Sequence, residues 1–318
     1  MQFRTPIPIT EIQFPIDYHS KILSLGSCFA VNMAEKLEYF KFQNSCNPFG
    51  IIFNPVSIEK LVQRAVHKRF FTEEDIFYHN DLWHCFEVHS ELSNPDKAIF
   101  LDSLNDLFDL TNQQISESTH FLITYGTAWV YRNKESNQIV ANCHKVPQKQ
   151  FTKELLSVER IQTALQNTIQ LIQTVNPEAK FILTISPVRH IKDGFVENQW
   201  SKAHLIAAIH STDNSQLTAH NYFPSYEIMM DELRDYRFYA EDMLHPNQLA
   251  IDYIWQRFKE TAISKSALPV LEEIGSIQSS LNHRPFNPES ESHQKFLVKL
   301  QKKITDICIR YPFMKFEL

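Results

Sequence analysis

Short, mostly apolar segments alternate along the chain with longer segments of helical periodicity. Runs of strand length lie at residues 21–25, 120–125 and 180–185, and each is followed by a glycine or a serine. Between and after them, apolar residues recur every three or four positions, which predicts helices at residues 28–42, 57–68, 97–114, 152–175, 200–210, 226–233, 246–262, 267–281 and 290–310. Buried strands separated by helices are typical of a parallel sheet with helices on both faces. The pattern therefore predicts an α/β fold.

Two segments depart from this alternation and predict hairpins. Residues 76–90 place alternating aromatic side chains around Asn80-Asp81, and a polar turn separates residues 128–132 from residues 138–143. A short strand is expected at residues 221–223.

The length of the chain and the position of its last helices predict one main domain followed by a smaller extension. The 318 residues are enough for one large core with an appendage. We expect a main α/β domain at residues 1–262, beginning with an extended, proline-containing arm, and a helical C-terminal extension at residues 263–318. No internal repeat and no low-complexity segment interrupts this division.

Glycine is scarce, and its distribution excludes common nucleotide-binding sites. The chain has 5 glycines, at positions 26, 50, 126, 194 and 275. A dinucleotide fingerprint needs three glycines within six residues, and a phosphate-binding loop needs two that are five residues apart. Neither spacing occurs, so we expect no nucleotide cofactor, and no other cofactor is indicated.

Charge and cysteine content narrow the classes of partner and compartment. The net charge of −6 argues against nucleic acid and anionic membranes as partners. No apolar run has the length of a membrane span, and no signal peptide is recognisable at the N-terminus. Neither CxxC nor HExxH occurs, so no metal site is expected. The cysteines are scattered and odd in number, which favours reduced thiols and a cytoplasmic location; they lie at positions 28, 46, 85, 143 and 308. The sequence leaves the oligomeric state open.

A hydroxyl, a carboxylate and an imidazole are candidates for acyl-transfer chemistry. Ser27 follows the first strand and opens a helix, where its side chain is expected to be exposed at the sheet edge and can attack an acyl carbon. The alternative is that Ser27 serves only as the helix N-cap. Asp242 precedes His245 by three residues, close enough in a turn to orient the imidazole as a base. The alternative is that this segment simply begins the helix at Pro246.

Five motifs together resemble a known family. The segment LSLGSCFA around Ser27 is similar to the motif that gives the GSCFA-domain family its name, and AEDMLHPN around His245 supports the same match. NPFGIIFNP, ITYGTAWVY and TISPVRH also resemble that family, whose relatives are the SGNH/GDSL esterases. The resemblance implies a flavodoxin-like three-layer sandwich with a central, mostly parallel sheet, small hairpin insertions and C-terminal helices. It also implies that Ser27 is the nucleophile, Asp242 the orienting acid and His245 the base.

The resemblance further implies an oxyanion hole and shows where this chain departs from the pattern. The backbone N–H groups of Ser27 and Gly50 occupy the positions of two donors. The third motif of the superfamily is G-x-N, whose asparagine is another donor, but this chain has Gly126-Thr127-Ala128 there. Asn47, Asn142 and the Thr127 hydroxyl remain alternative donors.

Other residues are candidates for the same cleft. Cys28 is a rival nucleophile, although one step along a helix turns a side chain by about 100°, and a small buried cysteine is the simpler interpretation. Arg189, His190 and His144 follow strands or hairpins and are candidate substrate-binding residues. Trp83, Trp129 and Trp200 are candidates for stacking on a sugar, with core packing as the alternative.

Three functions remain open on the sequence alone. The first is a serine esterase that removes an O-acyl group, above all O-acetyl, from a small molecule or a carbohydrate. The second is a glycan-binding protein that keeps the cleft and has weak catalysis or none. The third is an acyltransferase that uses the same three residues, with a hydroxyl acceptor in place of water.

Overall fold

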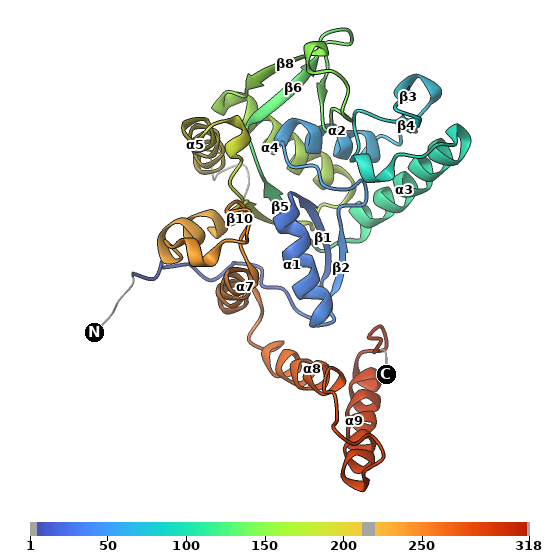
Figure 1. Cartoon of the computed structure of the whole chain (residues 1–318), viewed down its shortest axis with the longest axis vertical. Coiled ribbons are helices and arrows are strands. Elements are labelled where there is room, and N and C mark those ends of the chain that lie inside the picture. Colours follow the sequence, from blue (N-terminus) through green and yellow to red (C-terminus); the bar gives the residue numbers. More distant parts are fainter. Residues whose placement is uncertain (1–4, 212–219, 317–318) are drawn as a thin grey trace.

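A parallel sheet of five strands forms the centre of the protein in a computed structural model that describes residues 5–211 and 220–316 (Figure 1). Its strands, in spatial order, are β10 (His220–Phe223), β9 (Lys180–Ile185), β5 (His120–Tyr125), β1 (Lys21–Gly26) and β2 (Gln43–Cys46). Every neighbouring pair is parallel. Counted along the chain, the order is 2-1-3-4-5, which is that of flavodoxin-like folds. The predicted α/β class is therefore confirmed.

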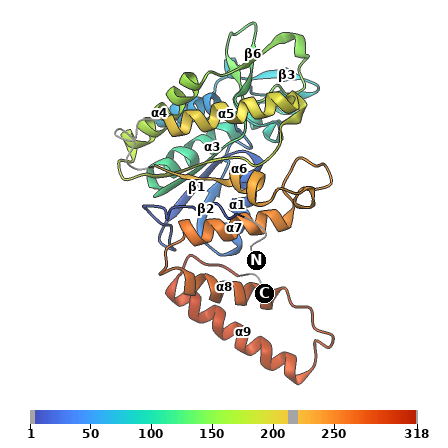
Figure 2. The ribbon, with the colours of Figure 1, turned by 90° about the vertical axis from the view of Figure 1, so that its left-hand side faces the viewer.

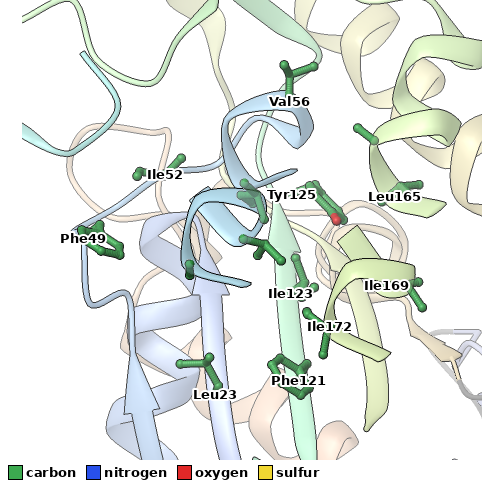
Figure 3. Packing of buried hydrophobic residues seen from close by; sticks show 14 of the residues in the cluster. Leu23, Phe49, Ile52, Val56, Phe121, Ile123, Tyr125, Leu165, Ile169 and Ile172 are labelled. Atoms are coloured by element: carbon green, nitrogen blue, oxygen red, sulfur yellow. The ribbon is translucent and has the colours of Figure 1, made fainter. Parts of the chain in front are cut away.

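Helices cover both faces of the sheet because successive strand residues point to opposite sides (Figure 2). Leu23 and Phe121 belong to one buried cluster, which Figure 3 shows at close range. The helices that complete this cluster are α2 (Pro55–Val66), α3 (Lys97–Glu117), α4 (Val158–Val175) and α5 (Phe195–Ser211). Ile22 and Leu122 face the other way and pack with α1 (Cys28–Tyr39) and α7 (Gln248–Ala262). These are the three layers of a sandwich.

The last two helices extend the second cluster away from the sheet (Figure 1). Helix α8 (Leu268–Leu281) contributes Ile274, and helix α9 (Glu291–Arg310) contributes Ile304 to the same apolar cluster as α1 and α7. No helix among the described residues has both the length and the apolar character needed to cross a membrane.

Small antiparallel sheets and short turns complete the fold. The expected hairpin at residues 76–90 is present as β3 (Phe77–His79) and β4 (Leu82–His84). The second expected hairpin is a three-stranded sheet of β7 (Ile139–Val140), β6 (Trp129–Asn133) and β8 (Phe151–Leu155). Shorter elements are α6 (Ser225–Glu227), a π turn at Ile228–Glu232, and 3-10 turns at Glu73–Asp75, Ser90–Leu92, Gln148–Gln150, Ile191–Asp193 and Tyr236–Phe238.

Several predicted boundaries are wrong, for identifiable reasons. Residues 152–155 are not helical, because they pair with β6 and the Ser157 side chain caps α4 only afterwards. Helix α7 begins two residues beyond Pro246, because Asn247 is its N-cap. Helix α5 begins at Phe195 and not at residue 200. Strand β2 has no counterpart among the predicted strands, since its four residues are polar or half-buried and form no apolar run.

The turn from β1 into α1 depends on a glycine. Gly26 has a φ of +130°, and a Cβ placed on it would lie 2.1 Å from the carbonyl oxygen of Thr124. The next residue, Ser27, donates its N–H to that same oxygen at 3.1 Å. The start of α1 is thereby held against the end of β5.

We expect Gly26→Ala to lower the free energy of unfolding by about 3 kcal/mol, through backbone strain and overlap with a fixed carbonyl. Gly275→Ala is the matched control. Gly275 lies inside α8, where a Cβ would make ordinary contact with Phe40 at 3.4 Å, so alanine should stabilise the protein by ~0.5–1 kcal/mol. Urea denaturation of both variants measures the difference. Equal effects would contradict the close approach at Gly26.

Candidate active site

A cleft of about 530 Å³ opens at the carboxyl end of the sheet. It lies where the strand order reverses between β1 and β5, the usual place for a ligand in such a fold. Its volume falls within the range of small-molecule sites. The residues used below that line it are Ser27, Cys28, Asn54, Thr127, Trp129, Tyr131, Asn142, Arg189, His190 and His245.

Asp242 and His245 form a close pair at this cleft. Asp242 Oδ2 lies 2.6 Å from His245 Nδ1, and Asp242 Oδ1 accepts the backbone N–H groups of Leu244 and His245 at 2.8 and 3.0 Å. These contacts lower the pKa of the Asp242 carboxyl to about 2, with the backbone N–H of His245 as the largest cause. The structure therefore brings together the two residues as the sequence suggested, with Nδ1 of the imidazole engaged by the carboxylate.

Arg189 supports the loop that carries this pair. Its Nη1 donates to the Met243 carbonyl at 3.0 Å, and its backbone N–H donates to the Leu244 carbonyl at 3.1 Å. The guanidinium lies 5.4 Å from the ring centre of Tyr239 and 5.7 Å from that of Tyr236. Arg189 lines the cleft as expected, but these contacts direct its side chain toward the loop.

Ser27 lies in the floor of the cleft. Its hydroxyl accepts the N–H of Phe29 at 3.2 Å, so Ser27 is the N-cap of α1. Only 1 % of the residue is exposed, which corrects the expectation of an exposed side chain. The cause is local: the cap turns the hydroxyl back over the first turn of the helix. Ser27 and His245 both line the cleft. Among the described residues, however, no hydrogen bond joins the Ser27 hydroxyl to His245.

The backbone donors expected for the oxyanion hole are already used. The Ser27 N–H donates to the Thr124 carbonyl, and the Gly50 N–H donates to the Asn47 carbonyl at 2.8 Å. Gly50 and Asn47 line a separate cavity of about 30 Å³ and not the cleft. The Asn47 side chain accepts the Gly26 N–H at 2.7 Å. The Ser27 N–H is thus taken by the end of β5, and the Gly50 N–H by its own turn. The Asn47 Nδ2 has no partner among the described residues, but it lies at the other cavity. These three assignments are therefore wrong for this structure.

Of the remaining expected donors, the Thr127 hydroxyl is engaged, whereas Asn142 is engaged through its acceptor oxygen. The Thr127 hydroxyl is paired with the Ser201 hydroxyl at 2.9 Å and accepts the Trp129 N–H at 3.0 Å. Asn142 lines the cleft, but its carbonyl oxygen accepts the His144 N–H at 2.8 Å. Cys28 lines the cleft too and is half-buried, in place of the fully buried position expected for it. Burial raises the pKa of its thiol.

The two histidine candidates differ in position. His190 lines the cleft with its ring 5.4 Å from that of Phe53, and its Nε2 has no partner in the described structure. Burial, and then the charges of Lys202 and His245, lower its pKa to about 3, so the ring is neutral. His144 is buried outside the cleft, where Nε2 lies 2.7 Å from the Cys85 carbonyl. It is therefore not a substrate-binding residue in this structure.

Three residues that the sequence did not single out support the site. Lys202 is buried beneath it, Ser201 contacts the loop after β5, and Asn54 caps α2 while lining the cleft. A signal for Lys202 existed: it lies on the buried stripe of α5, between Asn198 and Leu205, where a lysine is unusual.

The fold and the cleft define a class of protein: a flavodoxin-like α/β sandwich that holds a paired aspartate and histidine where its strand order reverses. The sequence model of the GSCFA family matches residues 21–258, so the chain belongs to the GSCFA family. The C-terminal domain of GSCFA domain proteins matches residues 274–318. No curated protein sequence matches the chain. The boundary that we expect at residue 262 lies between the matched regions and stays a prediction.

The expectation that the chain has no metal site depends on how its possible metal ligands are arranged. Within the described ranges, no group of three or more His, Cys, Asp or Glu side chains is arranged to hold a metal ion.

The titration of Asp242 tests the geometry of the pair. Its folded pKa of about 2 lies below the ordinary value of 3.8, so its stabilising effect is complete above about pH 4 and is lost as pH falls toward 2. Carbon-13 NMR should find the carboxyl still almost fully ionised at pH 3.8. In His245→Ala the two backbone donors remain and the imidazole is lost, so the pKa should rise but stay below 3.8. A wild-type carboxyl half protonated at pH 3.8 would contradict the contacts.

Proposed function

We propose that the protein is a serine ester hydrolase of the SGNH type that removes an O-acyl group, with an O-acetylated carbohydrate as the substrate class. The observation that carries the proposal is the 2.6 Å contact between Asp242 and His245 at a cleft whose floor contains Ser27. Family membership supports the proposal, since the motifs around Ser27 and His245 both lie inside the matched region.

The chemistry follows from the positions of these three groups. Asp242 holds Nδ1 of His245, so that Nε2 accepts the proton of the Ser27 hydroxyl as its oxygen attacks the acyl carbon. The ester C–O bond then breaks, and the imidazolium returns the proton to the leaving alcohol. Water, deprotonated by His245, attacks the acyl carbon, and the bond from that carbon to the Ser27 oxygen breaks. The carboxylic acid leaves, and the imidazolium returns its proton to the Ser27 oxygen. The Ser27 oxygen accepts the Phe29 N–H, and its own O–H proton is the one that turns to Nε2 of His245 before attack.

The start of α1 supplies stabilisation for the negative charge that develops. The N–H of Cys28, the first residue of the helix, is hydrogen-bonded to no oxygen among the described residues. The N-terminal end of a helix also carries the positive end of its dipole. A donor here lies next to the attacking oxygen, where an oxyanion forms.

The walls of the cleft support a carbohydrate as the part that carries the acyl group. Trp129 and Tyr131, from β6, line it beside the polar side chains of Asn142 and Asn54. Aromatic surfaces with a few polar groups are the usual lining of small-molecule sites. Trp129 is fixed by its indole N–H, which donates to the Glu197 carbonyl at 3.1 Å. Trp83 and Trp200 do not line the cleft.

A fluorophosphonate probe tests the nucleophile. We expect the probe to label wild-type protein and the label to map to Ser27 by peptide mass spectrometry, because the reaction needs an activated hydroxyl. Ser27→Ala should abolish labelling. Cys28→Ala is the matched control at the adjacent position and should retain it. Labelling that persists in Ser27→Ala but disappears in Cys28→Ala would assign the nucleophile to the thiol and contradict the proposal.

The Asp242–His245 contact has a kinetic consequence. Asp242→Asn removes the acceptor that fixes the imidazole tautomer, so kcat for p-nitrophenyl acetate should fall by about 10³–10⁴-fold. Asp235→Asn, at an exposed 3-10 turn cap outside the cleft, is the control and should leave kcat unchanged. A similar kcat for Asp242→Asn and wild type would show that the pair is not part of the catalytic machinery.

A glycan-binding protein without catalysis is a second candidate, favoured by the internal use of the Ser27 and Gly50 N–H groups. It predicts that acetylated oligosaccharides bind with the same Kd to wild type and Ser27→Ala, and that neither protein releases acetate. Calorimetry and acetate release separate the two functions.

A further inference from the structure

A buried lysine without an anionic partner lies directly beneath the site. Lys202 is 1 % exposed, and its Nζ donates to the carbonyl oxygens of Gly126 and Ser186, at 2.7 Å each. The Tyr226 ring lies 5.4 Å away on another side. No carboxylate among the described residues forms an ion pair with Lys202. The two carbonyls follow β5 and β9, so the ammonium joins the ends of neighbouring strands.

Core packing alone does not account for this residue. Burial without a counter-ion is costly for the charged form and lowers the pKa of the Lys202 amino group to about 7, whereas an apolar side chain of the same length would fill the space without that cost. What the ammonium adds is two strong hydrogen bonds to backbone carbonyls at the sheet edge. The role of Lys202 therefore depends on the two peptide groups whose carbonyls it binds.

One of those peptides, Gly126–Thr127, joins the held carbonyl to a residue of the cleft. The chain contains no cis peptide among the described residues, and in a trans peptide the C=O and the following N–H point in opposite directions. Because Lys202 holds the Gly126 carbonyl in the interior, the Thr127 N–H is directed away from the ammonium. Thr127 itself lines the cleft.

The other N–H groups of this loop are all used. Gly126 donates to the Phe53 carbonyl at 2.8 Å, Ala128 donates to the Ser201 hydroxyl at 2.7 Å, and Trp129 donates to the Thr127 hydroxyl. Among the described residues the Thr127 N–H has no acceptor. The loop that departs from G-x-N thus has one backbone N–H without an acceptor, and it belongs to a residue that lines the cleft.

We propose that Lys202 is a positioning residue that holds the Gly126–Thr127 peptide so that the Thr127 N–H replaces the missing asparagine as an oxyanion donor. The inference rests on the ester hydrolysis proposed above. The Cys28 N–H and the Thr127 N–H then approach the developing oxyanion from α1 and from the loop after β5. These are the two segments that Gly26 and Thr124 hold together.

Two substitutions of similar size separate positioning from packing. Lys202→Met fills the space without a donor, and Lys202→Gln keeps an N–H that can reach a carbonyl. For p-nitrophenyl acetate we expect Lys202→Met to lower kcat by about 10²-fold, the scale of one lost oxyanion donor, with KM nearly unchanged. Lys202→Gln should recover a substantial part of the loss. Lys21→Met, at an exposed ion pair with Glu117 at the far end of β1, is the control.

The outcomes distinguish this inference from the function on which it rests. Wild-type protein that neither hydrolyses the ester nor reacts with fluorophosphonate contradicts both. Active wild type with an unchanged kcat in folded Lys202→Met, or equal losses in the Met and Gln variants, overturns the role of Lys202 alone. Circular dichroism and thermal unfolding establish whether each variant is folded.

If Lys202→Met does not fold, a second experiment removes the Thr127 N–H itself. Replacing Thr127 by its α-hydroxy acid counterpart turns the N–H into an oxygen and leaves Lys202 in place. The loss of one oxyanion donor should then slow ester hydrolysis by about 10²-fold, which supports the proposal. An unchanged rate of hydrolysis overturns it.

Discussion

The close approach of Gly26 to the Thr124 carbonyl is the constraint on which the site depends. That oxygen occupies the space of any side chain at residue 26, and it accepts the N–H of Ser27. The two contacts place the first turn of α1 beside the loop after β5. Because the strand order reverses between β1 and β5, the cleft opens at this junction. A hydroxyl at the helix N-terminus and the loop at Thr127 therefore share one space.

Three titratable side chains around this junction differ in charge because their surroundings differ. Lys202 lies below it and joins the ends of β5 and β9. His190 lies in the same cleft, and burial together with the nearby Lys202 charge lowers its pKa, so it adds no second cation. Asp242 stays ionised beside His245 because backbone N–H groups stabilise its charge. Two histidines that line the cleft contact an acidic side chain: His245 lies 2.6 Å from Asp242, and His89 lies 3.5 Å from Glu91. The shorter contact suits His245 to the role of base that we propose.

The sequence predicts best those features that are local in the chain. The strands at residues 120–125 and 180–185 are continuous apolar runs, and Asp242 and His245 are three residues apart in one turn. The direction in which a backbone N–H points leaves no comparable pattern in the sequence. The prediction of a Gly50 donor is wrong because the turn from Asn47 closes on itself. Residues 151–155 and Lys202 have partners far along the chain. The helical spacing of α5 could have marked Lys202 as a buried lysine, but it could not show which carbonyl groups that lysine binds.

The most direct test of the proposed nucleophile and its oxyanion donors is a crystal structure of the protein after reaction with a fluorophosphonate. We predict phosphorus bonded to the Ser27 oxygen, with the phosphoryl oxygen accepting the N–H groups of Cys28 and Thr127, and His245 Nε2 within hydrogen-bond distance of the adduct. Phosphorus on another residue would contradict this mechanism. So would a phosphoryl oxygen that faces away from both N–H groups.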